Sequence, residues 1–83
     1  MEIKELKKMC NGIKAEFAIG KAGITDTFIE SVHDYIDVHK IVKVKVNNAI
    51  DKNDVKRLAQ EVAQSTDSEV LETKGFTFCL GVE

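Results

Sequence analysis

The chain has 83 residues, of which 43% are hydrophobic and 31% are charged. This is an ordinary composition for one small globular domain, and the length excludes a multi-domain enzyme with separate substrate and cofactor lobes. Twelve Lys and Arg residues against 14 Asp and Glu residues give a net charge of −2, so any surface that attracts a polyanion must be local. Residues 1–50 hold eight of the basic side chains, and we therefore expect phosphate contacts early in the chain.

Two further features of the composition concern location and redox state. No apolar stretch approaches the ~20 residues that span a bilayer, and the chain opens on a charged amphipathic segment, so we expect a cytoplasmic protein without a membrane partner. Cys10 and Cys79 are the two cysteines. Such low cysteine usage predicts reduced thiols in the core and no disulfide.

The first half of the chain predicts a helix, a strand and a second helix. Apolar residues at helical spacing predict a helix over residues 2–11. Apolar and polar residues then alternate, which predicts a half-buried strand over residues 13–19. A longer helix follows, capped by Thr25 or Thr27 and ending near His39.

The second half predicts a strand, a helix and a hairpin. Residues 41–46 alternate and are rich in β-branched side chains, which is typical of a strand. A third amphipathic helix follows, capped by Asp51 or Asn53. Residues 70–74 and 76–82 are extended candidates on either side of a turn, and we interpret them as a closing hairpin.

The resulting order is α-β-α-β-α-β-β. Alternating strands and helices imply right-handed crossovers and at least one parallel strand pair, so the predicted fold class is a two-layer α/β sandwich with a four-stranded mixed sheet. The sequence has no proline, no Gly/Ser-rich linker and no internal repeat, which predicts a single domain over residues 1–83.

A G-x-x-G segment between the first strand and the second helix is the main functional candidate. It consists of Gly20, Lys21, Ala22 and Gly23. Glycines at such a turn allow another backbone to approach closely, and the helix that follows offers partial positive charge to a phosphate, to which Lys21 adds a full charge. The alternative interpretation is an ordinary tight turn.

Residues 17–25 and 39–46 together resemble the CRM domain family, named for chloroplast RNA splicing and ribosome maturation, in its single-domain YhbY-like form. In that family an apolar strand leads into G-K-x-G-[IL]-T, a helix ends near a histidine, and the next strand alternates apolar residues with lysine. The resemblance implies a fold similar to the C-terminal domain of translation initiation factor three and an RNA-contacting G-x-x-G loop similar to that of KH domains. Family members commonly end the last strand on a Tyr-Arg-like pair, whereas residues 76–83 contain no cation.

Strand direction adds further residues to the candidate site. If the first two strands are parallel, their carboxyl ends meet at one edge, beside the start of the third helix with Lys52 and Lys56. We also expect the first helix to run back antiparallel and to bring its lysines to this edge. The alternative is that these lysines are merely solvated. The predicted RNA-binding residues are Gly20, Lys21, Ala22, Gly23, Lys45, Asn47, Lys7 and Lys8.

No catalytic or metal-binding arrangement is predicted. His33 and His39 are six positions apart and do not share a helix face, and the two cysteines lack zinc-site spacing. Tyr35 is interpreted as a core residue and not as a base-stacking platform. We therefore expect a monomer that is not an enzyme and has no cofactor or metal.

The sequence thus favours an RNA-binding module that contacts the backbone of structured RNA. The resemblance implies ribosomal RNA in large-subunit assembly as the target. One alternative is an Alba-like architectural binder of DNA or RNA. The other is a protein adapter that pairs through its sheet face or edge, which the acidic last third of the chain favours.

Overall fold

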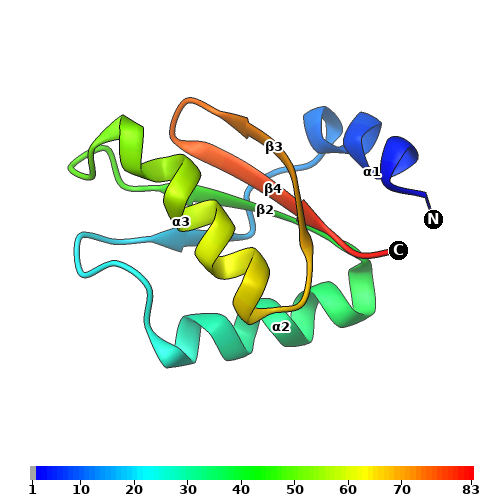
Figure 1. The fold of residues 1–83 in the computed structure, drawn as a ribbon, viewed down its shortest axis with the longest axis horizontal. Coiled ribbons are helices and arrows are strands. Elements are labelled where there is room, and N and C mark those ends of the chain that lie inside the picture. Colours follow the sequence, from blue (N-terminus) through cyan, green and yellow to red (C-terminus); the bar gives the residue numbers. More distant parts are fainter. Residues whose placement is uncertain (1) are drawn as a thin grey trace.

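A computed structural model describes residues 2–83 (Figure 1). Every predicted helix and strand is present in the predicted order, although the first strand is shorter than expected. The elements are α1 (Ile3–Met9), the 3-10 turn η1 (Cys10–Gly12), β1 (Phe17–Ile19), α2 (Asp26–His39), β2 (Ile41–Val46), α3 (Lys52–Ser65), β3 (Glu69–Lys74) and β4 (Thr77–Gly81). None of the helices in the described residues is long and apolar enough to cross a membrane.

The four strands form one mixed sheet in the order β1-β2-β4-β3. β1 and β2 are parallel, and Ala18 lies beside Lys45 in their register. β4 is antiparallel to both of its neighbours, β2 and β3. The predicted mixed α/β sheet with one parallel pair is therefore confirmed.

Two N-cap residues were predicted for each long helix, and in both cases the structure uses the first of the two. The Thr25 hydroxyl accepts a hydrogen bond from the Phe28 N–H at 3.1 Å and starts α2. The Asp51 carboxylate accepts from the Asn53 N–H at 2.8 Å and starts α3. These side chains satisfy backbone donors that the helices themselves leave unpaired.

The main core lies between one face of the sheet and the pair α2 and α3. Strand residues point to this face at alternate positions, as the period of two requires. Burial of these side chains supplies the largest part of the hydrophobic stabilisation. Its buried residues are Ile19, Val32, Ile36, Val42, Val44, Val46, Val55, Leu58, Ala59, Val62, Ala63, Phe78 and Leu80.

A smaller core holds α1 against the opposite face of the sheet. Leu6 and Cys10 of the first helical segment pack with Ile41, Leu71 and Cys79, which point away from α2 and α3. The remainder of this face carries polar strand residues and stays open. The sheet is thus covered fully on one side and partly on the other.

The cysteine expectation is partly wrong. Both cysteines are core residues as predicted, with Cys10 0% and Cys79 1% exposed. The structure nevertheless joins them in a disulfide, with 6.2 Å between their Cα atoms, where reduced thiols were expected. The two cysteines are 69 positions apart, and their contact depends on which face of the sheet α1 covers. The sequence alone therefore did not predict the disulfide.

Both long helices start at the same end of the molecule, which we call the loop end (Figure 1). It contains the β1–α2 loop (residues 20–25), the β2–α3 loop (residues 47–51) and the β3–β4 turn. Hydrogen bonds join its parts, from Asn47 N–H to Ile19 O at 2.9 Å and from Val46 N–H to Phe76 O at 2.6 Å. The opposite end contains the carboxyl ends of α2 and α3.

Candidate nucleic-acid interface

The Gly20–Gly23 segment forms a tight turn at the loop end. The Gly23 N–H donates to the Gly20 carbonyl oxygen at 3.0 Å, which places Lys21 and Ala22 at the exposed corner. Gly23 has φ +83°, a conformation that favours glycine. A Cβ atom at Gly20 or Gly23 would meet nothing within 4 Å among residues 2–83, so the space directly beside both glycines is open.

The corner of this turn presents unused backbone donors. Within residues 2–83, the N–H groups of Lys21 and Ala22 donate to no carbonyl oxygen. They lie in the loop that leads to the Thr25 cap of α2, whose amino end carries partial positive charge, while the exposed Asp26 in its first turn adds a negative charge. Exposed N–H groups beside a helix amino end suit an anion.

Lys45 and Asn47 lie close to this loop, as the parallel strand pair predicted. Lys45 is exposed and pairs in register with Ala18. Asn47 follows β2 and bonds to Ile19 through its backbone. Its side-chain oxygen accepts from the Ala49 N–H at 2.8 Å and shapes the β2–α3 loop, so the side-chain amide is the group left to meet a phosphate.

Lys74 also belongs to the loop end, and the sequence did not indicate it. Thr77 of β4 pairs with Lys45 on one side and with Lys74 on the other. The two exposed lysines therefore lie in one row, separated by one strand, which puts their backbones roughly 10 Å apart. The hairpin turn after Lys74 was the sequence feature that could have placed this lysine at the loop end. That inference also requires the pairing of β4 with β2, which the sequence did not predict.

The helix that carries Lys7 and Lys8 lies away from the β1–α2 loop, so its expected position is wrong, although Asn11 just after it lines a hollow with Lys74 and Thr77. Leu6 lies beside Gly81, at the end where β4 finishes and β2 begins. Figure 1 accordingly shows α1 far from the β1–α2 loop. The physical reason is that η1 and the extended residues 13–16 separate α1 from β1, so the direction of the strand does not fix that of the helix.

The start of α3 adds charges of both signs to the loop end. Lys52 is exposed on the first turn, as is Lys56 one turn later. Against them stand the capping Asp51 and Asp54, although Asp54 is paired with Arg57 at 3.6 Å. The first turn of α2 also carries an exposed acid, Asp26, so the start of each long helix combines a favourable dipole with a carboxylate that repels an anion.

The lysines of the described chain have no intramolecular counter-charge. The ion pairs within residues 2–83 join Arg57 to Asp54 and Glu61, and none involves a lysine. An ammonium group that is free of a carboxylate keeps its full attraction for an external anion. The lysines of the loop end are thus available for binding.

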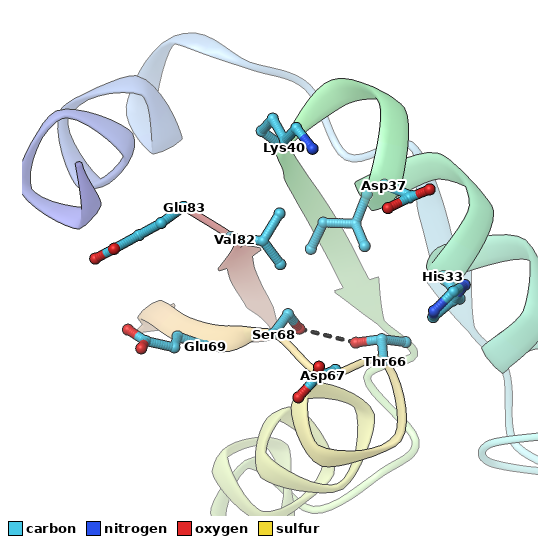
Figure 2. A pocket seen from close by; sticks show the side chains of 11 residues that line it. His33, Asp37, Lys40, Thr66, Asp67, Ser68, Glu69, Val82 and Glu83 are labelled. Atoms are coloured by element: carbon cyan, nitrogen blue, oxygen red, sulfur yellow. Dashed lines mark hydrogen bonds between the residues drawn. The ribbon is translucent and has the colours of Figure 1, made fainter. Parts of the chain in front are cut away.

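The opposite end has the reverse character, and we call it the acidic end. A hollow of about 430 Å³ lies between the carboxyl ends of α2 and α3, where helix dipoles are negative (Figure 2). The Thr66 and Ser68 hydroxyls in its wall are hydrogen-bonded at 2.8 Å. Within residues 2–83, no group of three or more His, Cys, Asp or Glu side chains is placed to hold a metal ion. The charged or titratable side chains that line the hollow are Asp37, Asp67, Glu69, Glu83, Lys40 and His33.

The fold is a small α/β domain whose loop end gathers Lys21, Lys45 and Lys74. The model of the CRS1/YhbY (CRM) domain matches residues 1–80. The chain therefore belongs to the CRM domain family, which confirms the resemblance seen in the sequence.

A solved structure supports the same assignment. The chain is similar to the Staphylococcus aureus protein SAV1595, a hypothetical protein described as a candidate RNA-binding protein. The TM-score is 0.83 at 27% sequence identity, over 98% of this chain and 83% of the other. A search of curated proteins gives no significant match.

Proposed function

We propose that this CRM domain binds structured RNA through the sugar-phosphate backbone at its loop end, without catalysis. The observation that carries the proposal is that the Lys21 and Ala22 N–H groups are free in the loop that leads into α2, at the same end as Lys45 and Lys74. Among residues 2–83 these lysines have no ion-pair partner. Backbone donors, a helix amino end and lysine are the groups that proteins use for phosphate. Membership of the family and the description of the similar structure favour RNA as the polyanion.

In this proposal the β1–α2 loop and the open face of the sheet contact different phosphates. A phosphate lies against the open space in front of Gly20 and Gly23 and accepts from the Lys21 and Ala22 N–H groups. Lys45 and Lys74 hold neighbouring phosphates from the open face of the sheet. Such contacts position a nucleic acid but read little sequence, so the loop end recognises the shape of its target.

The proposed target is ribosomal RNA during assembly of the large subunit. The support is the family itself, because the resemblance to the single-domain form implies ribosome maturation. The acidic end supports a one-sided mode of binding, since Asp37, Asp67 and Glu69 there repel phosphate. The RNA therefore meets the molecule from the loop end.

Titration of the protein against ribosomal RNA at several salt concentrations tests this proposal. About four to six lysines reach the phosphates, so a plot of log affinity against log salt should have a slope of roughly −3 to −5. Duplex DNA is the competitor, and it should displace the RNA poorly. Strong displacement would favour the Alba-like alternative, and a partner protein whose binding is insensitive to salt would favour the adapter.

A further inference from the structure

A groove of about 380 Å³ lies beside the first half of β2, outside the loop end. β1 pairs only with Val44–Val46, and just before it the Glu16 N–H donates to the Lys43 carbonyl oxygen at 2.9 Å. Among residues 2–83, no strand therefore pairs with Ile41 and Val42 on this side. The chain before β1 and the end of α1 border this gap, and they contribute the half-buried Ile13 and the 37% exposed Met9. The groove is therefore apolar at its base and open to solvent.

Two stacked rings form one wall of this groove. The rings of Tyr35 and His39 lie 4.1 Å apart between centroids, with 30° between their planes. Tyr35 is half-buried and held edge-on by Phe17 at 5.4 Å, whereas His39 is exposed at the last residue of α2. Tyr35 packs against the main core as expected, and this fixed ring supports the exposed ring of His39.

The charged side chains that line the groove favour an anionic ligand, although the negative carboxyl end of α2 borders it at His39. Lys14 and Lys43 line it together with a single acid, Glu16. The Lys43 ammonium group is held in place, because it donates to the Cys10 carbonyl oxygen at 3.1 Å. A ligand that combines a flat apolar ring with a negative charge fits both the wall and the rim.

The groove is connected to the loop end by a row of aromatic rings. Phe28, in the first turn of α2, packs edge-on against Phe17 at 6.1 Å, and Phe17 packs in the same way against Tyr35. The row follows α2, whose 14 residues span roughly 20 Å. A few nucleotides of extended single strand can cover that distance.

We propose that the groove binds an unstacked base of a single-stranded segment that extends from RNA held at the loop end. The inference rests on the proposed function and deepens it, since it names single-stranded RNA as part of the ligand. The base stacks on the His39–Tyr35 pair and covers the Ile13 side chain, and Lys14 meets the adjoining phosphate. Aromatic rings bind unpaired bases in this way in many RNA-binding proteins.

Two RNAs and two matched variants test the inference. The first probe is a hairpin with a ten-nucleotide uridine overhang, and the second is the same hairpin with abasic ribose throughout the overhang. The variants are His39→Ala and His33→Ala, which remove an exposed histidine from the same helix on and off the groove. His39→Phe retains a ring and is the rescue variant.

We expect the wild-type protein to bind the uridine overhang at least about five-fold more tightly than the abasic one. His39→Ala should abolish this preference, whereas His33→Ala and His39→Phe should keep it. Tyr35 is the single tyrosine and the chain has no tryptophan, so quenching of the intrinsic fluorescence by the uridine overhang reports stacking at this groove.

Each outcome decides the inference. Equal affinity of the wild-type protein for the two hairpins would overturn it and leave backbone binding at the loop end intact, as expected if the groove takes a protein side chain instead. A base preference that survives His39→Ala would also overturn it. Failure to bind either hairpin would overturn both this inference and the proposed function.

Discussion

The two ends of this molecule are built from the same two helices and the same sheet, yet they carry opposite electrostatic character. At the loop end, α2 and α3 begin, and within the described residues 2–83 the exposed lysines Lys21, Lys45 and Lys74 have no ion-pair partner. At the acidic end, both helices finish around a hollow that contains Asp37 and Glu69. A net charge of −2 thus conceals a separation of charge along the sheet.

The topology of the sheet, and not only the composition of the chain, determines at which end of the molecule the charges lie. Because β1, β2 and β3 all run the same way, each crossover helix must start at their carboxyl ends and finish at their amino ends. The helix dipoles then add to each other at both ends. An acidic protein can therefore present one surface on which a polyanion is attracted.

The largest expected effect is on stability and lies outside the loop end. The disulfide closes a loop of about 70 residues, which in the chain-entropy model contributes roughly 4 kcal/mol to the free energy of unfolding. Denaturant unfolding with and without reductant measures this contribution. The double variant Cys10→Ala/Cys79→Ala is the control and should not respond to reductant. An unfolding curve of the wild-type protein that ignores reductant would show that the thiols are unpaired in solution.

Substitutions at Gly20 and Gly23 should distinguish the effect of backbone strain on stability from the effect of the loop on RNA binding. Gly23→Ala should cost about 1–2 kcal/mol of stability, because a Cβ atom is strained at φ +83°. Gly20 has no positive φ and open space around it, so Gly20→Asp should leave stability within about 0.5 kcal/mol and still weaken RNA binding at least ten-fold. Thermal unfolding and RNA titration of both variants check this. If Gly20→Asp bound RNA as tightly as the wild-type protein, the loop would not be part of the RNA-binding interface.

A smaller effect is expected from the lysine row on the open sheet face. Neutralising Lys45 or Lys74 with glutamine should each weaken RNA binding about three-fold and lower the magnitude of the salt slope by about one. Lys8→Gln on α1 is the comparison, since the structure places that helix away from the loop end. A larger loss from Lys8→Gln than from Lys74→Gln would mean that the RNA crosses α1 instead.

Local sequence patterns predicted the elements but not every contact between them. The caps, strand alternation and Gly20–Gly23 turn depend on near neighbours, so the sequence indicated them correctly. The positions of Lys7 and Lys8 and the pairing of Cys79 depend on which face of the sheet α1 covers, and no short pattern encodes that choice. Lys74 was missed for a similar reason, because its row exists only through the pairing of β4 with both neighbours.

A matched pair of charge reversals tests the central claim most directly. Lys21→Glu changes the loop end and Lys40→Glu changes the acidic end, at opposite ends of α2 and with the same change in net charge. We expect Lys21→Glu to weaken RNA binding at least ten-fold, equivalent to ~1.4 kcal/mol, while stability stays within about 0.5 kcal/mol. The probe is a hairpin without a single-stranded overhang, so that the groove beside His39 stays empty, and Lys40→Glu should leave affinity for this RNA nearly unchanged. Equal losses from the two substitutions would contradict the account, since total charge and not the loop end would then govern binding.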